Sequence, residues 1–86
     1  MPYAERNRNL YSKRGDVDQS IALLVRAELL KSPYSAIRAV ACRSQDDVLI
    51  LSGRVPSYYF KQVAQRLAMD AIGGLATIDN QLQVER

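Results

Sequence analysis

Leu75-Ala76-Thr77-Ile78-Asp79-Asn80-Gln81-Leu82-Gln83-Val84 is the stretch that decides the fold of this chain. Ile78, Leu82 and Val84 lie on one parity of the stretch, and polar side chains occupy the other. This alternation is typical of a strand with one buried face. Asn80 is the exception, because it falls on the apolar parity. We therefore predict a last strand over residues 75–84 in which one amide side chain faces the core.

A helix is predicted from Ser57 to Ile72, directly before that strand. Ser57 is a suitable N-cap, and Gly73 suits the left-handed residue that often ends a helix. Apolar side chains form one broad stripe on it: Phe60, Val63, Ala64, Leu67, Ala68, Ala71 and Ile72. The alanines in this stripe would let the helix approach a sheet closely.

A first helix is predicted over residues 17–31, with Asp16 or Asp18 as its cap and Pro33 beyond its end. Its apolar face would consist of Ile21, Leu24, Val25 and Leu29. Two strands are then predicted over residues 37–42 and 48–52, joined by a loop of five polar residues, 43–47, as in a hairpin with a longer connection.

This order of elements is helix, strand, strand, helix, strand. A strand, helix, strand unit within one sheet normally forms a right-handed parallel crossover, so the last strand should be parallel to the second. The predicted fold class is α+β, an α-β-β-α-β arrangement with two helices packed on one face of a three-stranded mixed sheet.

Size and composition bound the function. The chain has 86 residues, of which 48% are hydrophobic and 24% charged, as expected of one small globular domain. Neither a signal peptide nor a membrane-spanning stretch is recognisable, so a cytoplasmic location is expected. With a single cysteine, Cys42, and no histidine, we expect no disulfide framework, no metal site and no cofactor. Cys42 is interpreted as a small core or sheet residue, with an exposed thiol or an intermolecular bridge as the alternative.

The net charge of +3 comes from the first fifteen residues, which contain four basic side chains and a single acidic one, Glu5. We divide the chain into a flexible basic arm, residues 1–15, and a domain, residues 16–86. The arm is interpreted as a solubilising terminus or as an electrostatic contact for anionic lipid or nucleic acid. Its basic residues are Arg6, Arg8, Lys13 and Arg14.

Nothing in the sequence indicates catalysis. The adjacent Asp46 and Asp47 are interpreted as a solvated turn, and no nucleophile motif or phosphate-binding loop is present. Nucleic-acid binding would depend on the arm alone, so it is the least supported of the binding classes.

The run Val48-Leu49-Ile50-Leu51-Ser52-Gly53-Arg54-Val55, the alanines of the second helix, Gly74, and the final Ile78-Asp79-Asn80-Gln81-Leu82-Gln83-Val84 together resemble the BON domain. The resemblance covers about residues 16–85. The resemblance implies a bacterial, non-enzymatic binding module that engages phospholipid membranes or envelope proteins. Members of the family include osmotically induced proteins and are more often periplasmic. Gly53, Gly74 and Asn80 would be its structural family residues.

Two groups of residues are candidates for binding. The first consists of tyrosines and basic side chains near element ends, which suit a lipid headgroup surface or simply cover the core edge: Tyr34, Arg54, Tyr58, Tyr59 and Lys61. The second is Val48 and Ile50, on the strand parity that the helices would leave open. They would form a homodimer or partner surface, unless Leu10 or Tyr11 of the arm covers them.

Gly53 and Asn80 are given structural roles. Gly53 is expected to serve a turn or close packing rather than a ligand groove. Asn80 is expected to hydrogen-bond to the backbone around Gly53, because a buried amide without partners costs about 1 to 3 kcal/mol.

Overall fold

The computed structural model describes the backbone of residues 2–85 and the side chains of residues 15–85. A three-stranded sheet is formed by β1 (Ala41–Gln45), β2 (Val48–Ser52) and β4 (Thr77–Asn80), in the order β1-β2-β4. β1 and β2 are antiparallel, whereas β2 and β4 are parallel. The predicted α+β architecture and the parallel crossover are therefore confirmed.

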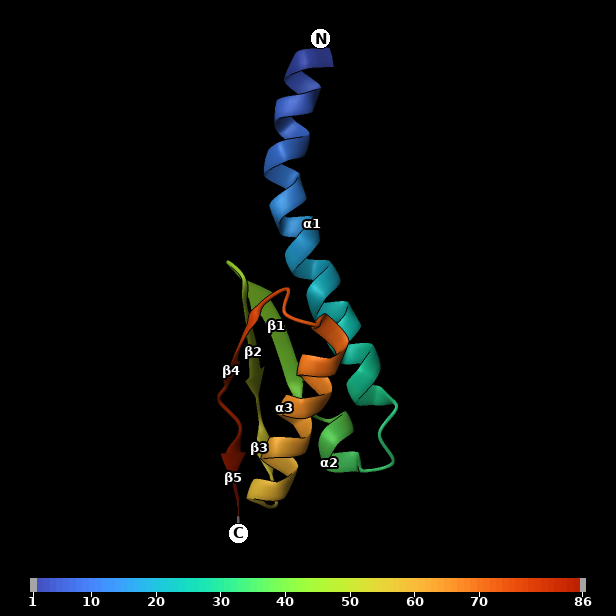
Figure 1. The fold of residues 1–86 in the computed structure, drawn as a ribbon, viewed down its shortest axis with the longest axis vertical. Coiled ribbons are helices and arrows are strands. Elements are labelled where there is room, and N and C mark those ends of the chain that lie inside the picture. Colours follow the sequence, from blue (N-terminus) through green and yellow to red (C-terminus); the bar gives the residue numbers. More distant parts are fainter. Residues whose placement is uncertain (1, 86) are drawn as a thin grey trace.

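Two helices, α1 (Pro2–Leu30) and α3 (Tyr58–Ile72), lie on the same face of this sheet (Figure 1). The core between the layers contains Leu49 and Leu51 of β2, both fully buried. The small side chains of α3, Ala64 and Ala68, are also fully buried there. The alanine stripe thus brings α3 close to the sheet, as its pattern predicts.

The first helix begins earlier than predicted. α1 starts at Pro2, so Asp16 and Asp18 lie inside it and cap nothing. A glycine inside a helix costs only about 1 kcal/mol relative to alanine, so Gly15 does not end it, and proline is well tolerated at the first helical position. The assignment of Leu24 to the apolar face of this helix is also wrong, because Leu24 is 50% exposed, whereas Ile21, Val25 and Leu29 are buried.

The region before β2 also differs from the prediction. Ile37 lies in a one-turn helix, α2 (Ser35–Arg38), and the first strand begins only at Ala41. The hairpin loop has two residues rather than five, because β1 continues through Gln45, which pairs with Val48. Asp46 and Asp47 both have positive φ, 52° and 66°, as two-residue hairpin turns of type I′ require. Aspartate is one of the few side chains that tolerate this region.

Both parallel strands bend at the same level. After Ser52, Gly53 takes a φ of 124° and β3 (Arg54–Val55) follows; after Asn80, two residues separate β4 from β5 (Gln83–Val84). β3 and β5 pair in parallel, and the amide of Gln83 donates to the Gly53 carbonyl at 2.9 Å. The predicted single strand over 75–84 is therefore interrupted, and the sheet continues beyond the bend as a two-stranded ribbon.

Candidate functional site

Three exposed tyrosines gather at the end of the domain where α1 finishes and α3 begins. Tyr34 immediately precedes α2, and Tyr58 and Tyr59 form the first turn of α3, whose N-cap Ser57 accepts the Phe60 amide at 3.3 Å. Tyr34 is 48% exposed, and Tyr58 and Tyr59 are each 63% exposed. We call this region, residues 28–38, 53–62 and 82–85, the tyrosine end.

Phe60 holds two of these tyrosines. Its ring meets that of Tyr34 at a centroid distance of 5.0 Å and that of Tyr59 at 5.7 Å, both edge to face. Such contacts are favourable for aromatic quadrupoles and fix the orientation of the rings. Tyr34 and Tyr59 are thus anchored on one side and open to solvent on the other.

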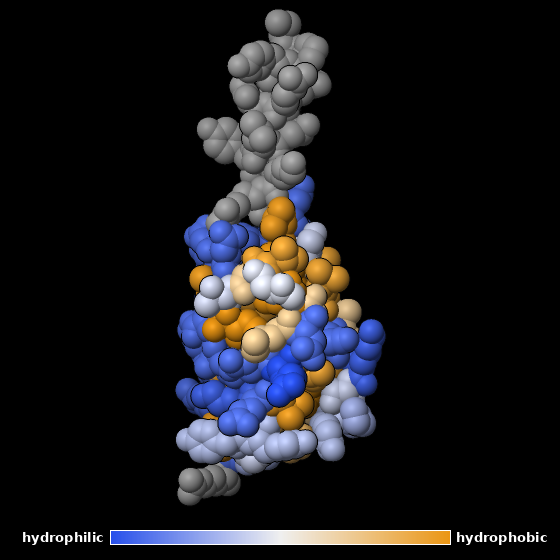
Figure 2. Space-filling model, viewed as in Figure 1, coloured by the Kyte–Doolittle hydropathy of each residue, from blue (hydrophilic) through white to orange (hydrophobic). Residues whose placement is uncertain are grey.

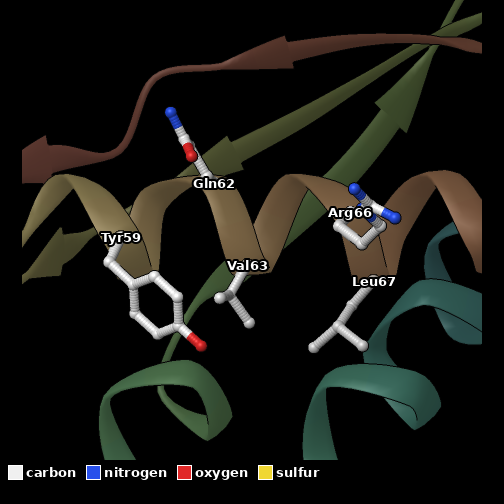
Figure 3. A pocket seen from close by; sticks show the side chains of 5 residues that line it. All are labelled: Tyr59, Gln62, Val63, Arg66 and Leu67. Atoms are coloured by element: carbon white, nitrogen blue, oxygen red, sulfur yellow. The ribbon is translucent and has the colours of Figure 1, made fainter.

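Two shallow hollows extend from these tyrosines along the boundary of α1 and α3. One, of ≈ 300 Å³, is lined by Tyr34, Pro33 and the end of α1; the other, of ≈ 210 Å³, is lined by Tyr59 and Arg66. Val63 and Leu67 line both, so the two hollows are adjacent. Figure 3 shows Tyr59, Val63 and Leu67 projecting from α3 toward α2 and α1. We call this surface the α1–α3 groove.

Charge is divided between the two ends of the domain. The tyrosine end carries four basic side chains, Lys31, Arg38, Arg54 and Lys61, against two acidic ones, Glu28 and Glu85. The opposite end, residues 15–20, 45–48 and 69–77, carries five carboxylates and no basic side chain. Figure 2 shows apolar side chains gathered near the middle of the viewed side of the domain, bordered by hydrophilic ones. Positive charge therefore predominates at the tyrosine end of the domain, and negative charge predominates at the opposite end.

The structure brings the predicted set Tyr34, Arg54, Tyr58, Tyr59 and Lys61 to this one end. Arg54 also donates to Glu85 Oε2 at 2.9 Å. Because both partners are largely exposed, this ion pair contributes little to stability. The side chains of Arg6, Arg8, Lys13 and Arg14 lie outside the described residues, as do Leu10 and Tyr11. The segment that contains them joins the described domain at Gly15, at the acidic end.

The open face of the sheet carries the second predicted group. Val48 and Ile50 are only partly buried, whereas Leu49 and Leu51 on the other face are inaccessible. Ile50 pairs in register with Arg43 of β1 and Asp79 of β4, and both of these are exposed. An apolar centre therefore lies between opposite charges.

Asn80 does not bind the Gly53 turn, so that prediction is wrong. Its Nδ2 donates to the Lys61 carbonyl at 3.0 Å and to Gln65 Oε1 at 3.1 Å, and its Oδ1 accepts the Leu82 amide at 3.1 Å. The side chain lies on the helix-covered face, and the nearest hydrogen-bonding groups there belong to α3. The contact between the last strand and Gly53 is made instead by main-chain groups.

Comparison with protein families gives a match to the BON domain over residues 17–86. The chain belongs to the BON domain family. A search of curated proteins gives no match. The structure confirms the predicted fold, and this match confirms the resemblance seen in the sequence. By family, this BON domain is a binding module.

Sequence reasoning missed part of the surface of this BON domain. Val63 and Leu67 were assigned to the core because they belong to the apolar stripe of α3. They lie at the margin of this stripe, where a side chain can be half-buried and still line a groove. The sequence did not indicate that Arg43 and Asp79 lie in one row across the sheet, because this row depends on the register of the strands. Gly53 takes a positive φ that glycine alone adopts readily, which supports its structural interpretation.

The described part of the chain contains no cluster of three or more potential metal ligands. It also contains no helix with the length and apolarity needed to cross a bilayer. Cys42 is half-buried, and its thiol donates to the Ala22 carbonyl at 3.5 Å. Burial raises the pKa of this thiol, and nearby Arg26 partly opposes the shift. Cys42 is therefore poorly suited to act as a reactive thiolate.

Proposed function

We propose that this BON domain binds anionic phospholipid surfaces through its tyrosine end and has no catalytic activity. The observation that carries the proposal is the gathering of Tyr34, Tyr58 and Tyr59 with four basic side chains at one end. Tyrosine rings are favoured at the headgroup level of a bilayer, where the ring body is apolar and the hydroxyl remains hydrated. The α1–α3 groove adds apolar surface next to them.

Electrostatics would orient the domain. Each basic side chain near an anionic surface contributes about 1 kcal/mol, and the tyrosine end has a surplus of such groups. In the form lacking residues 1–15, the five carboxylates at the other end would be repelled, so the domain would stand with its tyrosines toward the lipid.

Sedimentation with vesicles tests the proposal. The probes are phosphatidylglycerol–phosphatidylcholine vesicles and vesicles of phosphatidylcholine alone, at low salt, with the full chain and with a form lacking residues 1–15. We expect binding to the anionic vesicles only, and a several-fold loss on replacing Tyr58 and Tyr59 with alanine. Leu75→Ala is the matched control, since Leu75 is also 63% exposed but lies at the acidic end. Equal binding by the tyrosine variant and the control would contradict docking through this end.

The open sheet face supports a second candidate function, weak self-association. A half-turn about an axis parallel to the strands places Ile50 on Ile50 of a second copy. The same rotation sets Arg43 of each copy opposite Asp79 of the other. Packed sheets lie about 10 Å apart, a distance that an arginine and an aspartate can bridge together. The face is only three strands wide, roughly 14 Å, so the dimer should be weak.

A further inference from the structure

β4 is an outer strand of the sheet (Figure 1). Half of the main-chain groups of an outer strand point away from its neighbour, here β2. The amide of Thr77 donates to the Asp47 carbonyl at 2.9 Å, and that of Gln81 donates to the Leu51 carbonyl at 2.8 Å. In a parallel ladder, every second residue directs both its amide and its carbonyl to the same neighbouring strand. Ile78 and Asn80 alternate with these residues, so their main-chain groups face the outer side.

A hollow of ≈ 480 Å³ lies beside this edge, between β4 and the C-terminal half of α3. Its apolar lining comes from Met69, Ile72, Ala76 and Ile78. Met69 is 53% exposed, so most of its thioether side chain is not used in the core. A flexible, polarisable methionine adapts well to a variable apolar group. The edge and the hollow together form what we call the β4 groove.

Asn80 keeps the groove at a fixed width. Its side-chain amide joins the strand to α3 through the Lys61 carbonyl and through Gln65, which also lines the hollow. The groove is therefore formed before any ligand arrives, which lowers the ordering cost of binding.

The charged side chains that line the hollow or belong to β4 are acidic, and Arg66 lines an adjoining hollow together with Gln65 and Met69. Asp70 lines the hollow, and Asp79 follows Ile78 on β4, with an exposed carboxylate on the open face of the sheet. The residues that line the hollow include no lysine or arginine. A segment with basic side chains next to an apolar one would match both features.

We propose that the β4 groove binds an extended peptide segment of a protein partner, which adds to the sheet as a strand beside β4. Main-chain hydrogen bonds to Ile78 and Asn80 would supply affinity, as in other cases of strand addition. One apolar side chain of the segment enters the hollow, and an adjacent lysine or arginine, which points to the opposite face of the sheet, lies near Asp79. The groove lies on the flank of α3 opposite Val63 and Leu67, so it is separate from the proposed lipid surface.

Selection from a display library tests this proposal. The probe is a library of random peptides about seven residues long, enough to span the strand, selected against the full chain. We expect enrichment of peptides with an apolar residue flanked by lysine or arginine. The best peptide, at saturation, should slow hydrogen exchange of the Ile78 and Asn80 amides by about tenfold or more, because each amide gains a partner.

Two matched variants locate the site. Met69→Arg fills the hollow and repels a basic peptide, so we expect an affinity loss of about tenfold or more. Leu24→Arg is the control, because Leu24 is also a helical residue with about half of its side chain exposed. It should leave the affinity unchanged. The proposal is overturned by a selection without enrichment, by peptides that leave the exchange of both amides unaltered, or by equal losses in the two variants. Failure here leaves lipid binding by the tyrosine end untouched.

Discussion

The side-chain amide of Asn80 donates to the main-chain carbonyl of Lys61 at 3.0 Å, which ties the last strand to the helix above it. The carbonyl oxygen of the same side chain accepts the Leu82 amide at 3.1 Å and so supports the bend between β4 and β5. One residue thus fixes both the separation of two layers and the shape of a strand.

Replacing Asn80 with alanine should lower the free energy of unfolding by about 1 to 3 kcal/mol, because the Leu82 amide loses its acceptor and the strand loses its contact with α3. Urea unfolding followed by circular dichroism measures the change. Gln83→Ala, at an exposed position on the same segment, should change stability by less than about 0.5 kcal/mol. Equal effects of the two substitutions would argue against the role assigned to Asn80.

Alanine at Gly53 and at Gly15 should have opposite effects. Gly53 has a φ of 124°, a conformation in which a side chain is strained, so Gly53→Ala should destabilise by about 1 to 3 kcal/mol. A methyl group there would only touch Leu82, at 3.8 Å, so the cost is in the backbone. Gly15 lies in α1 with nothing within 4 Å, and Gly15→Ala should stabilise by about 0.5 to 1 kcal/mol. Thermal unfolding of the two variants gives the comparison.

The fold was predictable because its two longest apolar patterns agree with each other. The alanine stripe of α3 and the alternation around Ile78 fix a helix and the strand that follows it, and the crossover rule then fixes their direction. Ile37 was misassigned because a short apolar run does not distinguish a strand from a single helical turn. Asp46 and Asp47 were placed in a turn, but the loop was predicted three residues too long, because their positive φ values, 52° and 66°, leave no hydropathy signal.

The site was predictable only in part. Tyrosines near element ends were recognised as a group, since chain topology brings those ends together. The partner of Asn80 was not, because a sequence shows that a buried amide needs acceptors without showing which chain segment supplies them. Similarly, Arg43 and Asp79 come into one row only through the pairing of both with Ile50.

The thiol of Cys42 should react slowly in the folded protein. Burial raises its pKa, so at pH 8 its thiolate fraction is smaller than in the unfolded chain. We expect alkylation by iodoacetamide to be several-fold slower than in denaturant. Because the folded state holds this proton more tightly, stability should fall as the pH rises above the unfolded pKa of about 8.5. Cys42→Ala should remove that part of the pH dependence, and an unchanged profile would show that Cys42 does not cause it.

Charge reversal at the tyrosine end should weaken vesicle binding. Arg38→Glu changes the local charge by two units, and at about 1 kcal/mol per charge this corresponds to a loss of roughly 30-fold. Arg26→Glu makes the same change in net charge on α1, away from the tyrosines, and should have a smaller effect. Titration with phosphatidylglycerol-containing vesicles at low salt compares the two. Similar losses would mean that net charge alone governs binding.

Self-association through the open sheet face predicts a specific pattern of charge-swap variants. In the two-fold arrangement Arg43 of each copy faces Asp79 of the other, so Arg43→Glu places two carboxylates opposite each other at both contacts. Asp79→Arg places two guanidinium groups there instead. Each variant alone should therefore be more monomeric than the unaltered chain in analytical ultracentrifugation at high protein concentration.

An equimolar mixture of the two variants should associate again, because a pair formed from one copy of each has opposite charges at both contacts. The double variant, with both substitutions in one chain, should likewise recover the original mass distribution. Ile50→Asp should abolish association in every combination, since it places a charge at the apolar centre of the face. Strictly monomeric behaviour of the unaltered chain, or a mixture that stays monomeric, would contradict this arrangement, since like charges inhibit association only when the two residues face each other.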